Sequence, residues 1–298
     1  MTESRAETPS IAAPSQSRVW LALGSLYWIW GSTYLAIRVA LDGFPPLTLA
    51  ALRFLIAGVL LLAWQRLRGA PMPTRQQWGA SAIVGALLVG ANTLVTIAEL
   101  SVSSGLTAVA VGSVPLWIGV VSGLFGKWPA RSEWLGLAVG FCGVALLNLG
   151  SGMRGAPLGA AMLLLSPLCW AFGSILSHRL RMPEGLTGTG ALMLCGGLMD
   201  VVLAVVRGEH LTQAPSGRAL IGLAWLVFAG SVVGYSAYTF LITRIRPTLA
   251  TSYAYVNPVV AMALGALFLH EPISASALVA MGFILSGVAL LARAKVTH

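Results

Sequence analysis

Charged side chains are the scarcest feature of this 298-residue sequence. Asp, Glu, Lys and Arg together make up 9% of the residues, whereas apolar residues make up 57%. Soluble globular domains usually carry about 25% charged residues. A chain with so few charges cannot cover a folded surface of this size with polar side chains. The composition therefore excludes a soluble globular protein and indicates that lipid surrounds most of the chain.

Cysteine is scarce as well, and the three cysteines form no pattern. Cys142, Cys169 and Cys195 lie far apart within apolar stretches, without CxxC or Cys/His spacing. Such spacing would be needed for a disulfide framework or a metal site. We expect three small buried side chains, no metal and no other cofactor.

Motifs of membrane-embedded enzymes are also missing. His270-Glu271 begins an HExxH pattern, but position 274 is Ser, so the zinc motif fails. The sequence contains no GxSxG motif and no pair of Asp residues in the middle of apolar stretches. These absences indicate a protein that is not an enzyme. A structural scaffold is the other non-transport alternative.

What the sequence does contain is an internal repeat. Three pairs of segments match at an offset of about 143 residues: LYWIWGS at 26–32 with LCWAFGS at 168–174, SVPLW at 113–117 with VNPVV at 256–260, and GVALL at 143–147 with GVALL at 287–291. A doubled hydrophobic chain is typical of transporters built from two structural repeats.

Apolar stretches of about 20 residues, the length that spans a bilayer, recur along the whole chain. The sequence predicts an all-α polytopic membrane protein of ten spans, at 19–40, 46–65, 77–98, 102–125, 132–150, 156–177, 187–206, 219–242, 248–269 and 274–292. We expect a disordered cytoplasmic tail at 1–18, a first five-helix repeat at 19–150, a second at 156–292 and a short cytoplasmic tail at 293–298.

The Lys and Arg residues predict the orientation of these spans. Of the 18, thirteen fall in the termini and in the loops on the same side as the termini, four fall on the other side, and Arg53 lies within a span. Because loops rich in Lys and Arg stay in the cytoplasm, both termini are expected to be cytoplasmic. Five spans per repeat then make the two repeats inverted relative to each other. Topology thus accounts for the net charge of +9, and no nucleic-acid partner is expected.

Several short motifs resemble one transporter family: WGSTY at 30–34, LRF at 52–54, the region of Pro115, GY at 234–235 and the region of Asn257-Pro258 followed by His270-Glu271-Pro272. Together with ten spans and the repeat, they resemble the EamA family of the drug/metabolite transporter superfamily, most closely YddG-type amino-acid exporters. The resemblance implies a basket-like fold whose central cavity is lined mainly by spans 1, 3, 4, 6, 8 and 9. It also implies export of amino acids and related small metabolites.

Polar and aromatic side chains within spans are candidate substrate contacts, because a solute that crosses a bilayer must replace its lost water. The alternative role for the polar ones is helix–helix contact. Asn92 and Thr96 share one helix face, and both repeats place polar groups at this depth. The predicted substrate-binding residues are Trp28, Tyr34, Asn92, Thr96, Ser113, Trp117, Trp170, Tyr235, Tyr238, Thr239, Tyr253 and Asn257.

Pro115 and Pro258 are predicted hinges, since a proline within a span leaves a carbonyl of the preceding turn without its helical partner. A purely structural kink is the alternative. Charges within or at the edge of spans are limited to Arg53, Glu99 and Asp200, which we expect to form a network towards the outer side. Arg53 either pairs with one of these acids or captures a substrate carboxylate directly.

The sequence therefore predicts a multi-pass transporter of a bacterial-type inner membrane that exports amino acids, aromatic or apolar ones above all, by alternating access. No carboxylate lies at mid-depth in spans 3, 4, 8 or 9, so we expect an uncoupled facilitator. The alternative function is export of drugs or quaternary amines, with proton coupling. The expected partners are a small-molecule substrate and the lipid bilayer. The oligomeric state stays open, and a monomer suffices for the predicted site.

Overall fold

The computed structural model describes residues 16–102, 107, 111–147, 157–269 and 275–293. Every regular element in these ranges is a helix, and none of them is a strand. The elements are α1 (Gln16–Leu41), α2 (Pro46–Leu67), α3 (Arg75–Ala98), α5 (Val114–Leu124), α6 (Arg131–Leu147), α7 (Pro157–Ser177), α8 (Gly185–Val206), α9 (Gly217–Trp225), the π-helix η1 (Leu226–Val233), α10 (Gly234–Ile242), α11 (Pro247–Ala250), α12 (Tyr253–Leu269) and α13 (Ala275–Arg293).

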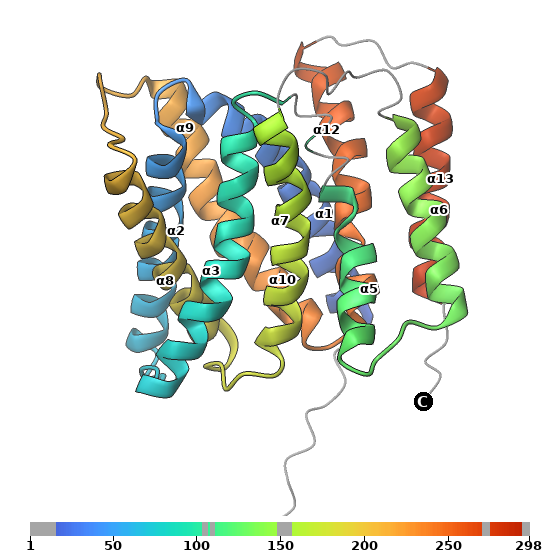
Figure 1. Ribbon diagram of the computed structural model, residues 1–298, viewed down its shortest axis with the longest axis horizontal. Helices are drawn as coiled ribbons and strands as arrows, with labels where there is room; N and C mark the ends of the chain where they lie inside the picture. The colour runs from blue at the N-terminus through green and yellow to red at the C-terminus, as the bar shows by residue number, and fades with distance from the viewer. Residues whose placement is uncertain (1–15, 103–106, 108–110, 148–156, 270–274, 294–298) are drawn as a thin grey trace, which may run out of the picture.

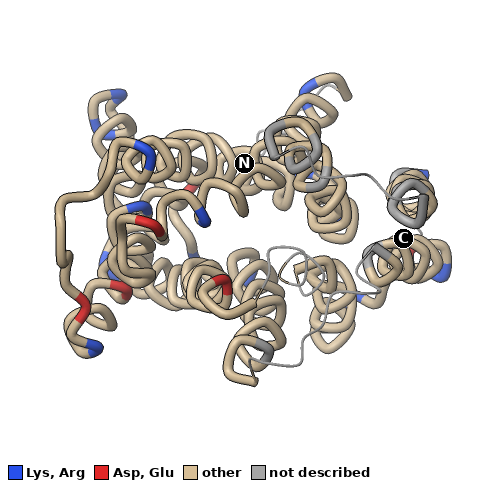
Figure 2. Tube along the Cα trace, turned by 90° about the horizontal axis from the view of Figure 1, so that it is seen from above, with Lys and Arg blue, Asp and Glu red and all other residues tan. Residues whose placement is uncertain are grey.

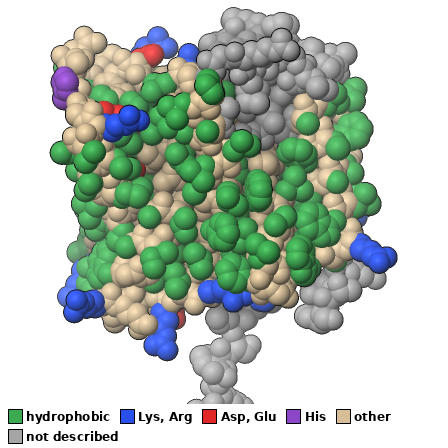
Figure 3. All heavy atoms as spheres, viewed as in Figure 1, with side chains coloured by type: hydrophobic (Ala, Val, Ile, Leu, Met, Phe, Trp, Pro, Cys, Tyr) green, Lys and Arg blue, Asp and Glu red, His purple; other side chains and the backbone are tan. Residues whose placement is uncertain are grey.

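Five helices are long and apolar enough to cross a membrane: α2, α3, α7, α8 and the continuous helix Gly217–Ile242, which comprises α9, η1 and α10. Two shorter apolar helices are α5 (Val114–Leu124) and the segment Gly282–Leu291 of α13. Hydrophobic side chains cover the middle of the face in Figure 3, while Lys and Arg gather at its upper and lower edges. This distribution confirms a polytopic membrane protein. His270-Glu271-Pro272 and most of the predicted N-terminal tail lie outside the described residues.

Helix starts follow the local sequence. Thr74 caps α3 in a capping box with Gln77, whose side chain accepts a hydrogen bond from the backbone N–H of Thr74 at 2.9 Å. Pro46 and Pro247 stand in the first turns of α2 and α11, where the missing N–H breaks no helical hydrogen bond. These capping and proline signals explain why the observed bounds lie close to the predicted ones.

Two predicted spans are interrupted. The backbone turns at Ser113 before α5 begins, and it turns at Thr251 and Ser252 between α11 and α12. The predicted span at 219–242 continues as one helix but widens into η1 in its middle. Such π-helical segments frequently mark functional sites, because their backbone is locally rearranged.

The helices stand side by side in a bundle (Figures 1 and 2). Its main hydrophobic core contains residues of both predicted repeats. Elements of the first repeat pack mainly on elements of the second: α2 packs on α8, α3 on α7 and α8, and α1 on α12, α9 and α10. The α6–α13 pair lies at one end of the bundle and contacts the other helices much less.

Small residues allow this close packing. A Cβ atom at Gly85 would overlap the carbonyl oxygen of Leu192 on α8, and a Cβ at Gly58 would lie 2.7 Å from the backbone nitrogen of Leu194. At these two points the added Cβ atom would meet the backbone of α8, so a side-chain movement cannot relieve the steric overlap of a larger residue. Gly79, also on α3, has no neighbour within 4 Å of such a Cβ.

We expect Gly85→Ala to destabilise the protein by about 1–3 kcal/mol, because α3 and α8 must separate to admit the methyl group. Gly79→Ala is the matched control and should leave stability unchanged or slightly raised, since alanine favours a helix over glycine. The melting temperatures of both variants in detergent check this. Equal melting temperatures would contradict the proposed backbone contact.

Candidate functional site

A central cavity of about 60 Å³ lies between helices of both predicted repeats. Its walls come from α1, α2, α3, α5, α7 and α12, together with Val111. The lining residues are Trp30, Thr33, Tyr34, Ile37, Arg53, Ala91, Asn92, Val95, Val111, Val114, Ser166, Trp170, Tyr253 and Asn257. The expected cavity was lined by spans 1, 3, 4, 6, 8 and 9. The structure adds span 2 through Arg53, and it places the tyrosines of span 8 behind the wall.

Trp30 forms the centre of an aromatic cluster beside this cavity. Its ring lies 4.5 Å from the ring of Tyr253, 5.4 Å from those of Trp170 and Tyr235, and 5.5 Å from that of Tyr238, measured between centroids. Most of these pairs are edge-to-face, which is a favourable geometry for aromatic rings. The cluster therefore joins α1 to α7, α10 and α12.

A chain of polar contacts lies next to the aromatic cluster. The Nε of Arg53 donates to Ser231 Oγ at 2.9 Å, and its Nη1 lies 3.5 Å from Asn92 Oδ1. Asn92 Nδ2 in turn donates to the hydroxyl oxygen of Tyr235 at 2.8 Å. The chain thus connects α2, α3, η1 and α10 at the depth of the cavity.

The three residues of the predicted charge network form no direct ion pair with one another. Among the described residues, the ion pair with a nitrogen–oxygen distance within 4.0 Å is Glu133–Arg246. Neither Glu99 nor Asp200 forms an ion pair within this distance. Asp200 Oδ1 accepts from Thr93 at 2.9 Å, and both carboxylate oxygens of the buried Glu99 lack a hydrogen-bond partner. The expected pairing fails because Arg53 turns towards η1, whose Ser231 binds its Nε.

Two predicted aromatic contacts do not reach the cavity. Trp28 is 52% exposed and Trp117 is 37% exposed, and neither side chain is part of the cavity wall. Trp30, which we did not predict as a contact, is buried there. Side chains two positions apart on an α-helix point in directions that differ by about 200°, so Trp28 and Trp30 cannot face the same way. The alignment of Trp28 with Trp170 in the repeat favoured Trp28, whereas Trp30 lies in the cavity wall.

The other predicted polar residues split into two groups. Five of the predicted residues line the cavity, namely Tyr34, Asn92, Trp170, Tyr253 and Asn257, and their contact with a substrate stays a prediction. The remaining residues contact neighbouring helices or their own helix. Thr96 donates a hydrogen bond to the Asn92 carbonyl at 3.0 Å, and Thr239 accepts one from Thr189 at 3.1 Å. Tyr238 is hydrogen-bonded to Ser174, and Tyr235 packs in the aromatic cluster. Ser113 lies at the turn before α5, outside the cavity wall.

The two predicted hinges occupy different positions in their helices. Pro115 lies in the first turn of α5, whereas Pro258 lies inside α12. The break in the second repeat comes earlier, at Thr251 and Ser252, and Ser252 Oγ lies 2.7 Å from the hydroxyl of Tyr27 on α1. A role of these prolines in gating stays a prediction.

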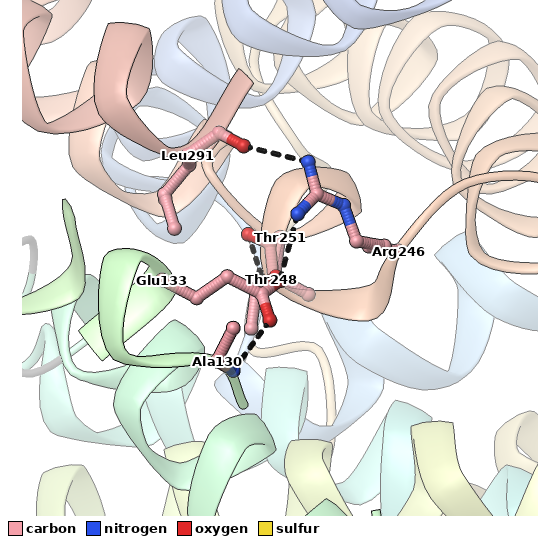
Figure 4. A network of polar contacts seen from close by, with 6 residues as sticks. All are labelled: Ala130, Glu133, Arg246, Thr248, Thr251 and Leu291. Atoms are coloured by element: carbon pink, nitrogen blue, oxygen red, sulfur yellow. Dashed lines mark hydrogen bonds and ion pairs between the residues drawn. The ribbon is translucent and has the colours of Figure 1, made fainter. Parts of the chain in front are cut away.

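One polar network lies at the C-terminal face, which we define as the face where α6 begins and α13 ends (Figure 4). Arg246 Nη1 lies 3.5 Å from Glu133 Oε1, and Arg246 Nη2 donates to the Leu291 carbonyl at 3.0 Å. Thr248 Oγ1 donates to Glu133 Oε1 at 2.6 Å, and Ala130 N donates to Oε2 at 2.9 Å. The network joins α6 of the first predicted repeat to α11 and α13 of the second.

A second pocket, of about 310 Å³, includes Lys127, His178 and Arg179. Burial and, to a smaller extent, the charge of Lys127 lower the pKa of His178, so this imidazole is neutral at pH 7. The positive charge of the pocket therefore comes from Lys127 and Arg179. No group of three His, Cys, Asp or Glu side chains that could hold a metal occurs in the described part of the chain.

Comparison with known proteins decides the family. A model of the EamA-like transporter family matches residues 18–149 and again residues 157–293. The chain belongs to the EamA-like transporter family. It is 41% identical over 276 residues to the inner membrane transporter YedA of Escherichia coli K12, covering 92% of this chain and 90% of YedA. It is 28% identical to the protein PecM of Dickeya dadantii, with 88% of each chain covered.

A solved crystal structure shares the fold of this EamA-like chain, with a TM-score of 0.78 over 93% of this chain and 98% of the other, at 20% sequence identity. The family is one of transporters and YedA is named as an inner membrane transporter, which confirms the predicted family and its transport function. The EamA-like fold therefore places the central cavity inside a transporter.

We expect Glu133→Gln to lower the melting temperature in detergent by several degrees, because Arg246 and Thr248 lose a charged partner and such hydrogen bonds contribute about 1.5–3 kcal/mol. Glu184→Gln removes an exposed acid at the start of α8 and should have little effect. Equal shifts in the two variants would show that the network does not hold the C-terminal face together.

Proposed function

We propose that this EamA-like transporter exports amino acids, with aromatic and apolar ones favoured, and related small metabolites across a bacterial-type inner membrane. Ten spans form two inverted repeats with both termini in the cytoplasm, and exchange of their conformations exposes the central site to each side in turn. One observation carries the proposal: a cavity between the two repeats combines the wall of Trp30, Trp170 and Tyr253 with the polar groups of Arg53 and Asn92.

The size of the cavity supports an alternating mechanism. Ligand pockets usually measure about 300–1,000 Å³, whereas this cavity of about 60 Å³ holds only a few water molecules. An amino acid therefore requires a wider state than the one described. The aromatic side chains around Trp30 and the network at Glu133 are the contacts that must rearrange to reach it.

The lining argues against the alternative substrates. Among the described residues, the cavity wall contains no Asp or Glu, and its charged residue is Arg53. A drug or quaternary amine would meet this positive charge without a compensating acid. A phosphate-bearing substrate calls for clustered Lys or Arg, and a single arginine does not supply such a cluster.

The same lining supports uncoupled transport. A proton-coupled mechanism usually places an ionisable carboxylate where it competes with or senses the substrate. Glu99 and Asp200 are buried, but neither is part of the cavity wall. We therefore retain an uncoupled facilitator that moves its substrate down the substrate's own gradient.

For the binding site we expect Trp30→Ala to reduce counterflow of labelled phenylalanine in proteoliposomes about tenfold or more, because the aromatic wall loses its central ring. Asn92→Ala and Asn257→Ala should reduce it as well. Trp28→Ala is the matched control on the same helix and should keep most of the flux, since this side chain faces outwards. Comparable losses in Trp28→Ala and Trp30→Ala would contradict the assignment of the cavity.

For the coupling we expect a pH gradient across the liposome membrane to leave the final distribution of phenylalanine at equilibrium. Glu99→Gln and Asp200→Asn should then change the rate of uptake but not its end point. The opposite result would be a pH gradient that drives phenylalanine above its equilibrium distribution. If Glu99→Gln or Asp200→Asn abolished this accumulation, proton coupling would be established and the carboxyl group that carries the proton would be identified.

A further inference from the structure

Arg53 is a buried cation that makes no direct ion pair. Its side chain is 2% exposed, and no carboxylate oxygen of a described residue lies within 4.0 Å of its guanidinium. A buried charge that lacks an opposite charge is costly, and proteins that keep one generally use it. The cost is reduced here by Ser231, by a long contact to Asn92 and by the ring of Phe54 at 4.7 Å.

These neighbours orient the guanidinium but leave part of it unoccupied. Of its five N–H donors, the Nε–H is bound by Ser231, and Nη1 makes only the 3.5 Å contact with Asn92 Oδ1. Nη2 has no hydrogen-bond partner among the described residues. Since Arg53 is part of the cavity wall, its remaining donors are available to a molecule in the cavity.

The π-helix η1 explains how the guanidinium is held. Ser231 lies within η1, and the preceding residue is Gly230. A Cβ atom at Gly230 would lie 3.2 Å from Arg53 Nη2 and 3.1 Å from Thr33 Cγ2, which is tighter than ordinary contacts. The Gly230 carbonyl also accepts from Trp30 Nε1 at 2.9 Å. One short segment therefore positions both the aromatic ring and the cation of the cavity.

We infer that Arg53 is the carboxylate-binding residue of this transporter, with Nη1 and Nη2 donating to the two oxygens of a substrate carboxylate and Ser231 and Asn92 acting as positioning residues. This inference rests on the proposed function and names the part of the substrate that the site recognises. The planar fork of a guanidinium matches a carboxylate in a way that an ammonium does not. The substrate is thus a small monocarboxylate whose apolar part lies against Trp30 and Trp170.

The test compares acids with their matched amides. Labelled phenylalanine and, in a parallel assay, labelled 3-phenyllactate are exchanged in proteoliposomes against unlabelled phenylalanine, phenylalaninamide, leucine, leucinamide, 3-phenyllactate and its amide. In the unaltered protein each acid should compete about tenfold or more better than its amide, because hydrogen bonds to charged groups contribute at least one factor of ten in affinity. Arg53→Gln should remove this preference, and Arg53→Lys should restore it only in part, since lysine keeps the charge without the fork.

Further variants cover the case in which Arg53→Gln does not fold. Ser231→Ala retains the arginine and removes the hydroxyl that holds its Nε, and it should weaken the acid preference several-fold. Gly230→Ala should do the same by displacing Nη2. Arg207→Gln removes an exposed arginine at the end of α8 and serves as the control that keeps the preference intact.

The outcomes separate this inference from the proposed function. If 3-phenyllactate exchanges, amino acids do not, and the acid preference still depends on Arg53, the inference stands and the amino-acid proposal falls. An unchanged acid preference in folded Arg53→Gln and in Ser231→Ala overturns the inference while leaving amino-acid transport intact. Equal competition by acids and amides in the unaltered protein overturns it as well.

Discussion

Inside a bilayer no water is available to hydrogen-bond a buried polar group, so a group that the protein leaves without a partner is costly. Arg53 makes a large demand of this kind, because its guanidinium lies in the interior of the bundle. Its contacts fix the positions of α2, α3 and η1 relative to one another. Asn92 then passes this constraint on to Tyr235 on α10. The geometry of the cavity therefore follows from how one guanidinium is accommodated.

The aromatic cluster depends on the same segment. Trp30 directs its only polar atom to the Gly230 carbonyl, and the rest of its ring surface is left for contact with Trp170, Tyr235 and Tyr253. A tryptophan that has satisfied its N–H can present an apolar face without a buried polar atom. The cavity consequently has an apolar wall beside a cationic one. This combination suits a molecule with an apolar part and an acidic group.

The sequence predicts the helices well because their signals are local. Apolar runs and prolines place a span at 46–65, and α2 occupies Pro46–Leu67; the run at 77–98 corresponds to α3 at Arg75–Ala98. The breaks at Ser113 and at Thr251 and the π-helical turn in the predicted span at 219–242 carry no comparable signal. Their backbone geometry depends on contacts with other helices, such as that of Ser252 with Tyr27.

Side-chain partners are harder to predict than helices. Opposite charges in the sequence favoured a pair between Arg53 and Glu99 or Asp200, yet the arginine binds Ser231 instead. The serine is distant in sequence and is one of many in the chain, so no pattern distinguishes it. Trp30 was not predicted for a related reason. The similarity between the repeats shows which positions correspond, but it does not show which way a side chain points, and that direction changes by about 100° per residue along a helix.

The two repeats differ in charge at the C-terminal face, and this difference bears on the proposed transport cycle. Two identical inverted repeats would give two states of equal energy, one open to each side. Here Glu133 and Arg246 join the repeats at one face, whereas the residues about 143 positions away from them in the sequence are Ser276 and Ser103. If the repeats exchanged conformations, the corresponding contact would lack both charges. In the proposed alternating cycle, the conformation that keeps this network would therefore hold an ion pair that the exchanged conformation lacks.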